Sequence, residues 1–205
     1  MLELYGKPTS INVRKVLWLC AGLDLPLHHD PAPAPELLAA LNPNRQVPVL
    51  RDGGFVLWES NSICRYLAAR AGRDDLLPAA AQPRARVEQW MDWQASDLNS
   101  AWRHVFMARV RHHPDYPDDA RAEASLAQWN RLMGVLDAQL ADGRAHVTGS
   151  AFTLADIVLG LSTQRWRSTP GSTPGSTPRL PNVEAWFERL RQQPGFAEHV
   201  DNGVA

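Results

Sequence analysis

Three short stretches of the sequence place polar side chains where an apolar run gives way to a helical pattern. In the first, "YGKPTSINVRKVLWL" from Tyr5, Ser10 stands just before the helical pattern and Asn12 lies just inside it. Serine at a helix start caps backbone N–H groups, and the unpaired N–H groups and the helix dipole there also attract an anion. A hydroxyl at this position could donate a hydrogen bond to a substrate thiolate and favour the ionised form of that thiol. The residues alone leave both roles open, helix cap and thiolate partner.

The second stretch is "NRQVPVL", in which Pro48 interrupts an apolar strand pattern. A proline cannot donate to a strand ladder, so either the strand lies at a sheet edge or the bond before the proline is unusual. Bonds before proline are the peptide type with appreciable cis occupancy, and a cis bond would expose the backbone of Val47 to a ligand. Its N–H and C=O groups could then pair with an extended peptide by strand addition. An edge-strand proline without a function explains the pattern equally well.

The third stretch is "WESNSI", in which Glu59 and Ser60 fall between a strand pattern and a helical one. Ser60 at the helix start could hold a carboxylate through its hydroxyl and backbone N–H groups, while Glu59 could receive an ammonium group. Together they would match an amino-acid head group that carries both charges. The alternative is that Ser60 caps the helix and Glu59 is solvated.

The elements that would position these side chains follow from apolar periodicity in the first 77 residues. They are strands over 2–5 and 25–29, a hairpin over 47–58 around Asp-Gly-Gly, and helices over 11–23, 35–41 and 60–72. The order β-α-β-α-β-β-α predicts an α/β domain with a mixed sheet and helical cover.

Residues 78–83 are predicted to be a linker, and residues 84–205 have an all-helical pattern. Apolar side chains follow one stripe of a long helix from Val87 to Phe106, and two further stripes run over 126–140 and 183–190. The chain therefore divides into an α/β domain and an all-α domain.

Two local patterns in the helical part have structural interpretations. "FTLADI" has Thr153 at a helix start and Asp156 three residues later, the spacing of a capping box, so Asp156 is assigned no catalytic role. "STPGSTPGSTP" over 168–178 repeats turn-forming residues, which predicts an extended or flexible loop between two helices.

Composition excludes several classes of function. A net charge of −1 over 205 residues argues against an electrostatic nucleic-acid binder, and no apolar run approaches the length of a membrane span, so we expect a cytoplasmic protein. Cys20 and Cys64 each lie in an apolar helical pattern, which favours inert packing of reduced thiols. The runs "HHD" at 28–30 and "HHPD" at 112–115 place neighbouring residues on one segment, where they do not converge on a metal, so no metal site is predicted.

Taken together, the three stretches resemble the cytosolic glutathione transferases. The order is Tyr-Gly…Ser-x-Asn-x-x-Lys-Val, then Asn-Pro-Asn-x-x-Val-Pro-Val-Leu, then Trp-Glu-Ser-Asn-x-Ile-x-x-Tyr-Leu. The resemblance continues through "GSAFTLADI" and "PNVEAWFERLRQQPGF" and is closest to bacterial members that use a serine. It implies a thioredoxin-like N-terminal domain, an all-helical C-terminal domain, a homodimer, and no cofactor beyond glutathione as co-substrate.

The same resemblance assigns roles to individual residues. Ser10 matches the hydroxyl that holds the glutathione thiolate, Asn12 supports it, and Thr9 is its rival because some members use a hydroxyl one residue earlier. The remaining glutathione-binding positions are the Val47 backbone, the cis-proline Pro48, the γ-glutamyl binders Glu59 and Ser60, and Arg45 and Gln46 at the glycyl carboxylate, where many members carry glycine and lysine.

A small hydrophobic electrophile is the expected second substrate, placed over the thiol and against the first long helix of the C-terminal domain. Trp102, Arg103 and Phe106 are candidates for its wall, and simple core packing of the aromatic residues is the alternative. Asp97 is a candidate to reach across the dimer interface to the glutathione amine.

The predicted function is a glutathione transferase in which the protein supplies no nucleophile of its own. A glutathione-dependent disulfide reductase is the alternative within enzymes, since members with a hydroxyl and an asparagine do that chemistry without a protein cysteine. A non-catalytic glutathione-binding or scaffold module is the alternative of another class. The sequence does not name the electrophile.

Overall fold

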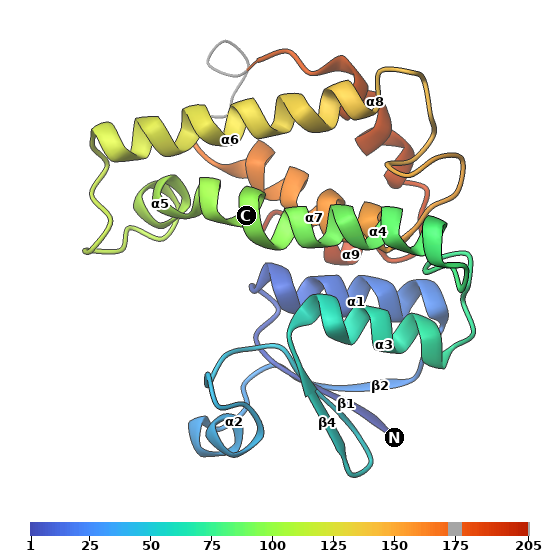
Figure 1. The fold of residues 1–205 in the computed structure, drawn as a ribbon. Helices are drawn as coiled ribbons and strands as arrows, with labels where there is room; N and C mark the ends of the chain where they lie inside the picture. Colours follow the sequence, from blue (N-terminus) through green and yellow to red (C-terminus); the bar gives the residue numbers. More distant parts are fainter. Residues whose placement is uncertain (172–177, 205) are drawn as a thin grey trace.

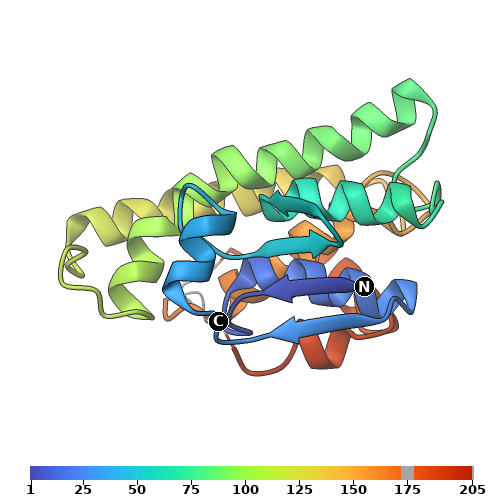
Figure 2. The ribbon, with the colours of Figure 1, turned by 90° about the horizontal axis from the view of Figure 1, so that it is seen from below.

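The computed structural model describes residues 1–171 and 178–204, which form an α/β domain and a helical domain (Figure 1). The sheet consists of β1 (Leu2–Tyr5), β2 (Leu27–Asp30), β3 (Val49–Asp52) and β4 (Phe55–Trp58), in the order β2-β1-β3-β4. β1 pairs in parallel with β2 and antiparallel with β3, and β3 pairs antiparallel with β4. Figure 2 shows β3 running opposite to its two neighbours, which confirms the mixed sheet and the predicted hairpin.

Three helices complete this domain: α1 (Ile11–Leu23), α2 (Pro35–Leu41) and α3 (Ser60–Arg70). Figure 1 shows α1 and α3 between the sheet and the helical domain, so the predicted element order is confirmed. β2 begins two residues later than the predicted strand at 25–29. The reason is that the Leu25 N–H donates to the carbonyl of Cys20 at 3.1 Å, so Leu25 still belongs to the turn that ends α1.

The second domain is helical, as predicted. Its elements are α4 (Ala81–Trp93), the π-helical turn η1 (Gln94–Leu98), α5 (Asn99–Arg109), α6 (Ala120–Gln139), α7 (Leu154–Ser168), α8 (Pro181–Leu190) and α9 (Phe196–His199). The long helix expected from Val87 to Phe106 is the continuous run α4-η1-α5, and α4 begins within the expected linker. The repeat at 168–178 lies largely outside the described residues, since α7 ends at Ser168 and residues 172–177 are not described.

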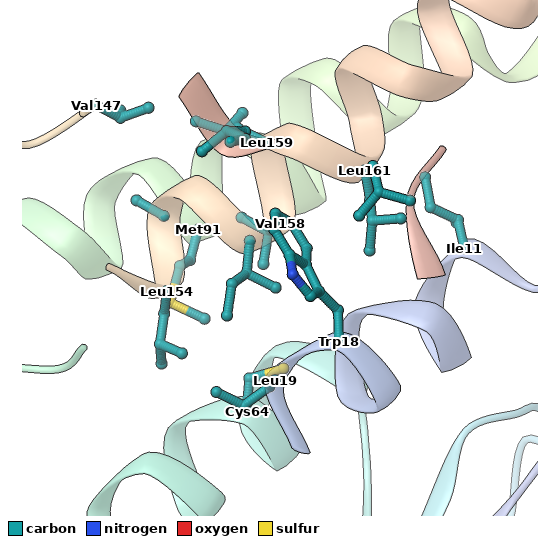
Figure 3. Close-up of a cluster of buried hydrophobic side chains, with 14 of the residues drawn as sticks. Ile11, Trp18, Leu19, Cys64, Met91, Val147, Leu154, Val158, Leu159 and Leu161 are labelled. Atoms are coloured by element: carbon teal, nitrogen blue, oxygen red, sulfur yellow. The ribbon is translucent and has the colours of Figure 1, made fainter. Parts of the chain in front are cut away.

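The two domains share one core, at which α1 meets α7. Trp18 of α1 lies against the rings of Phe152 and Phe196, at centroid distances of 5.7 and 5.6 Å, and donates from Nε1 to the Pro194 carbonyl at 3.1 Å. Figure 3 shows this indole pointing from α1 into the apolar side chains of α7. Gly160 permits the approach, because a Cβ there would lie 3.1 Å from Trp18 Cζ3.

Asp156 organises the start of α7 as the capping-box pattern predicted. The carboxylate is fully buried and accepts hydrogen bonds from the Thr153 N–H at 2.9 Å, the Thr153 hydroxyl at 3.1 Å, the Val147 N–H at 3.0 Å and Trp186 Nε1 at 2.8 Å. It therefore holds the preceding loop and α8 as well as its own helix end.

We expect Asp156→Ala to lower the free energy of unfolding by about 4 kcal/mol, because it leaves several buried donors without an acceptor. Denaturant unfolding followed by circular dichroism measures the change. Asp142→Ala is the matched control, since that exposed carboxylate bonds only to its neighbour Arg144 and to the backbone beside it, and its midpoint should stay close to that of the parent. Equal losses in the two variants would contradict the role of Asp156.

Candidate active site

The register of the sheet brings the three polar stretches to one end of it. Tyr5 pairs with Val49, and Val49 pairs with Trp58, so these three residues form one row across β1, β3 and β4. The chain leaves this row toward Ser10 after β1, enters it from Pro48 before β3, and leaves it toward Glu59 after β4. The segments that the sequence singled out separately are therefore neighbours in space.

Ser10 is the N-cap residue of α1, with φ −80° and ψ 122°, but its side chain caps nothing. Its carbonyl accepts from the Arg14 N–H at 3.0 Å, while its half-exposed hydroxyl makes no hydrogen bond within residues 1–171 and 178–204. The hydroxyl is thus free to bind a ligand at the positive end of the helix dipole. Asn12 is half-buried one position into the helix, and the Thr9 side chain is exposed.

The bond between Val47 and Pro48 is cis, so an unusual bond and not an edge position accommodates the proline. β3 lies inside the sheet rather than at its edge, and it begins after the proline, at Val49. In the described chain neither the N–H nor the C=O of Val47 bonds to another backbone group. Both groups are available to an extended peptide.

Gly6 holds the Val47 segment close to the start of α1, a role that the sequence reasoning did not assign. Its φ is +145°, and a Cβ at this position would lie 2.8 Å from Val47 Cβ and 2.6 Å from Val13 Cγ2. Contacts that short are not tolerated, so the close approach of the two segments needs glycine. The Tyr-Gly pair at the end of a strand was the available signal.

Glu59 and Ser60 stand at the start of α3. Glu59 has φ +71° and ψ 109°, a conformation that costs a non-glycine residue about 1–3 kcal/mol and tends to occur at functional sites. Its side chain is exposed and forms no ion pair with the described residues. Ser60 is buried, and its hydroxyl likewise has no hydrogen-bond partner in that part of the chain. The pair presents a carboxylate and a hydroxyl beside free helix N–H groups.

Arg45 and Gln46 lie on the loop that leads to the cis bond, and both side chains are exposed. Arg45 has φ +53°, and Asn42 shapes this loop by donating from Nδ2 to the carbonyl of Gln46 at 2.8 Å. Both side chains are therefore accessible to a ligand that binds along the Val47 backbone.

The predicted wall of the second substrate lies on α5. Trp102 and Phe106 share one face of the helix, with ring centroids 5.3 Å apart, while Arg103 is exposed. Arg111, just beyond α5, stacks on Phe106 at 5.4 Å and approaches the Thr9 carbonyl with Nη2 at 3.4 Å, which joins this face to the segment before Ser10. Asp97 is an exposed residue of η1 and accepts a hydrogen bond from the Ser96 hydroxyl at 3.1 Å.

Lys15 is a buried polar residue that the sequence reasoning missed. Its ammonium donates to Gln94 Oε1 at 2.7 Å and to Asn61 Oδ1 at 3.2 Å, which joins α1 to η1 and α3. Burial lowers the pKa of Lys15 to about 8, with Cys64 and Glu59 opposing the shift and Arg165 adding to it. Asn61 also donates to the carbonyl of Met91, so the network crosses the domain boundary directly behind Ser60.

The two cysteines are structural. Cys20 and Cys64 are free and buried, and burial raises the pKa of each thiol to about 12, so neither supplies a thiolate near neutral pH. Within residues 1–171 and 178–204 no three histidine, cysteine, aspartate or glutamate side chains are grouped to hold a metal ion. No helix of these residues combines the length and apolar character needed to cross a membrane.

Comparison with known proteins agrees on one family. The glutathione S-transferase N-terminal domain model matches residues 4–75, and the corresponding C-terminal domain model matches residues 100–194. Glutathione S-transferase GstB of Escherichia coli is 36% identical over 98% of each chain. Glutathione S-transferase 3 of Zea mays is 35% identical over 97% of this chain and 93% of its own.

Solved structures give the same result. The theta class glutathione S-transferase of Xanthomonas axonopodis pv. citri, with glutathione bound, superposes with a TM-score of 0.87 at 36% identity. The match covers 97% of this chain and 96% of that one. Both domains and their arrangement are therefore shared with that structure.

We expect Lys15→Met to remove a pH dependence of stability. Lys15 has a pKa of about 8 in the folded protein and an ordinary value near 10.5 when unfolded, so between these values the unfolded chain binds more protons. The lysine therefore makes the free energy of unfolding rise with pH between about 8 and 10.5, by on the order of 3 kcal/mol. Below about pH 8 the buried ammonium is charged, and there its burial destabilises the fold most. Urea unfolding at a series of pH values measures the slope in parent and variant.

Lys7→Met is the matched control, because Lys7 is exposed and is the only other lysine of the chain. It should keep the slope of the parent between about pH 8 and 10. A Lys15→Met variant with the slope of the parent would show that the lysine does not titrate in this window.

Proposed function

The chain belongs to the glutathione S-transferase family and is a glutathione S-transferase enzyme, and from that premise we propose that Ser10 activates the glutathione thiol. The observation that carries the proposal is the meeting of three segments at one end of the sheet, with the Ser10 hydroxyl free of any capping bond. A hydroxyl that donates to a thiolate at a helix N-terminus lowers the thiol pKa.

The other groups of the tripeptide have counterparts along the same row. The free N–H and C=O of Val47 suit the backbone of the cysteinyl unit, next to the cis bond of Pro48. Glu59 and Ser60 suit the ammonium and carboxylate of the γ-glutamyl unit. Arg45 and Gln46 are accessible to the glycyl carboxylate, and Asn12 supports Ser10 as a second donor. Each assignment matches one charge or hydrogen-bonding group of the ligand.

The chemistry then needs no protein nucleophile. The glutathione thiolate attacks the electrophilic carbon, a C–S bond forms, and the leaving group departs with the bonding electron pair. The protein contributes a lower thiol pKa and the proximity of the two substrates. The electrophile would lie over the thiol, toward the α5 face that carries Trp102 and Phe106.

We expect Ser10→Ala to lower kcat at least about tenfold near pH 6.5, because each pKa unit lost costs a factor of ten in thiolate. The dissociation constant of glutathione should change by less than about threefold, since the other contacts remain. Steady-state conjugation of a chloronitrobenzene, together with thiolate absorbance of the binary complex against pH, measures both effects.

Thr9→Ala is the control for this experiment, since its hydroxyl is the rival and its side chain is exposed. It should behave like the parent in kcat and in the pKa of bound glutathione. A Ser10→Ala variant with full turnover and an unchanged pKa of bound glutathione would contradict the assignment to Ser10. If Thr9→Ala instead lost turnover and raised that pKa, the role would belong to Thr9.

We further propose that the enzyme is a homodimer in which Asp97 contacts the glutathione amine bound by the other subunit. Asp97 is exposed on η1, and Phe55 on β4 is 49% exposed, with its ring tilted against that of Tyr66 at a centroid distance of 5.2 Å. Sedimentation velocity should give the mass of two chains. Asp97→Ala should weaken glutathione binding several-fold without dissociating the dimer. Asp74→Ala, at another exposed aspartate, should bind glutathione like the parent. Equal binding by the two variants would refute the contact.

A further inference from the structure

Three guanidinium groups lie close enough to one another near the start of α1 to interact, and none of them pairs with a carboxylate of the described residues. Arg14 lies one helical turn after Ser10 on α1, and Arg111 reaches the Thr9 carbonyl at 3.4 Å. Arg165 of α7 lies over the Phe106 ring at 4.1 Å, and Arg111 lies over the same ring at 5.4 Å. The group, here called the arginine cluster, therefore draws on both domains.

The arginine cluster differs from the other arginine environments of the molecule. Arg109, two residues before Arg111, pairs with Asp118 at 2.9 Å and also with Glu123. Across the described ranges, none of the three cluster members takes part in an ion pair. Arg14 donates from Nη1 to neutral oxygens, Asn202 Oδ1 at 3.1 Å and the Val204 carbonyl at 2.9 Å. Among the described residues, therefore, no carboxylate neutralises this positive charge.

Two members of the cluster are almost completely buried and have N–H groups without acceptors. Arg14 is 1% exposed, with Nε and Nη2 unpartnered, and Arg165 is 4% exposed, with Nε unpartnered. The two Nη atoms of Arg165 make no hydrogen bond with the described chain either, and they retain contact with solvent. A buried cation without an anionic partner is costly, and a bound anion would offset that cost.

The titration of the cluster agrees with this geometry. Burial lowers the pKa of Arg165 to about 9, and the neighbouring charges of Arg14 and Arg111 add to the shift. Burial, followed by the charge of Arg111, lowers the pKa of Arg14 to about 10. Burial, followed by the charge of Arg165, also lowers the pKa of the neighbouring Lys15. The neighbouring charges that lower the pKa values of Arg14 and Arg165 are therefore all positive.

The aromatic face of α5 is covered by this charge. Arg165 lies 4.5 Å from the centroid of the Trp102 ring and 4.1 Å from that of Phe106, so it covers one face of each ring. A second substrate on this side of the two rings would therefore contact a guanidinium group as well as aromatic carbon.

We propose that the arginine cluster is an anion subsite of the second-substrate pocket, and that the preferred electrophile carries a carboxylate or sulfonate group. The proposal rests on glutathione binding beside Ser10, and it changes the expected electrophile from a purely hydrophobic one to an anionic one. Guanidinium groups bind such anions with paired N–H donors, which adds orientation to attraction. The anionic group stays unchanged in the reaction, while the thiolate displaces the leaving group at a carbon held next to it.

A matched pair of substrates tests the proposal: 4-chloro-3-nitrobenzoate and its methyl ester. In both, the thiolate forms a C–S bond and chloride leaves with its electron pair, so the pair differs in charge. The measured quantity is the ratio of kcat/KM for the carboxylate to kcat/KM for the ester, each corrected for its uncatalysed rate. We expect Arg165→Met to lower this ratio at least about tenfold and Arg165→Lys to retain most of it.

Arg111→Met serves as a second variant, because Arg111 is exposed and its loss does not open a core. It should lower the same ratio by about threefold to fivefold. Arg131→Met, an exposed arginine of α6, is the control and should leave the ratio unchanged. An unchanged ratio in both Arg165→Met and Arg111→Met would overturn the anion subsite.

Two further outcomes are informative. If both substrates slow equally in Arg165→Met, and the thiolate titration of bound glutathione shifts upward, the cluster stabilises the glutathione thiolate and the anion subsite is wrong. If the parent enzyme turns over neither substrate and shows no thiolate on addition of glutathione, the assignment to Ser10 fails instead. The ratio and the titration therefore separate failure of the subsite from failure of the proposed function.

Discussion

The position of α1 between the sheet and α7 is the constraint on which the rest of the structure depends. Val13 and Val16 are fully buried on this helix, while Trp18 extends from it into the helical domain and bonds to the Pro194 carbonyl. Because both domains hold the helix, its N-terminus has one position relative to each of them. Ser10 therefore stands at the boundary of the two domains, next to the segment that Arg111 contacts, and the position of the proposed site follows from the packing of a single helix.

A helix buried on two sides must also bury polar residues, and α1 does so in two different ways. The ammonium of Lys15 is matched by two amide oxygens, which satisfy hydrogen bonds without adding negative charge. Arg14 has neutral acceptors for one nitrogen and none for two others. The hydrogen bonds of Lys15 form a satisfied polar contact between the domains. Arg14, in contrast, keeps two N–H groups without an acceptor.

Local patterns in the sequence predicted most of the fold, and contacts between distant elements account for what they missed. The hairpin around Gly53, the capping box of Asp156 and the proline before β3 are each encoded within a few residues. Helical periodicity assigned α1 a single apolar face, so the burial of Lys15 by a second domain was not visible. The glutathione-binding residues remain predictions, although the sheet register does bring their segments together.

The wall predicted from Trp102 and Phe106 shows why side-chain type alone is an incomplete guide to a pocket. The two rings do share one face of α5, as their spacing implies, but Arg165, from a helix more than fifty residues later, covers that face. Cation–π contact stabilises the guanidinium there without neutralising it. In the sequence, Trp102 and Phe106 indicate an apolar pocket. In the structure, the same two rings hold the guanidinium group of Arg165. In our proposal, Arg165, which the rings hold, and not the rings themselves, sets the preference for the second substrate.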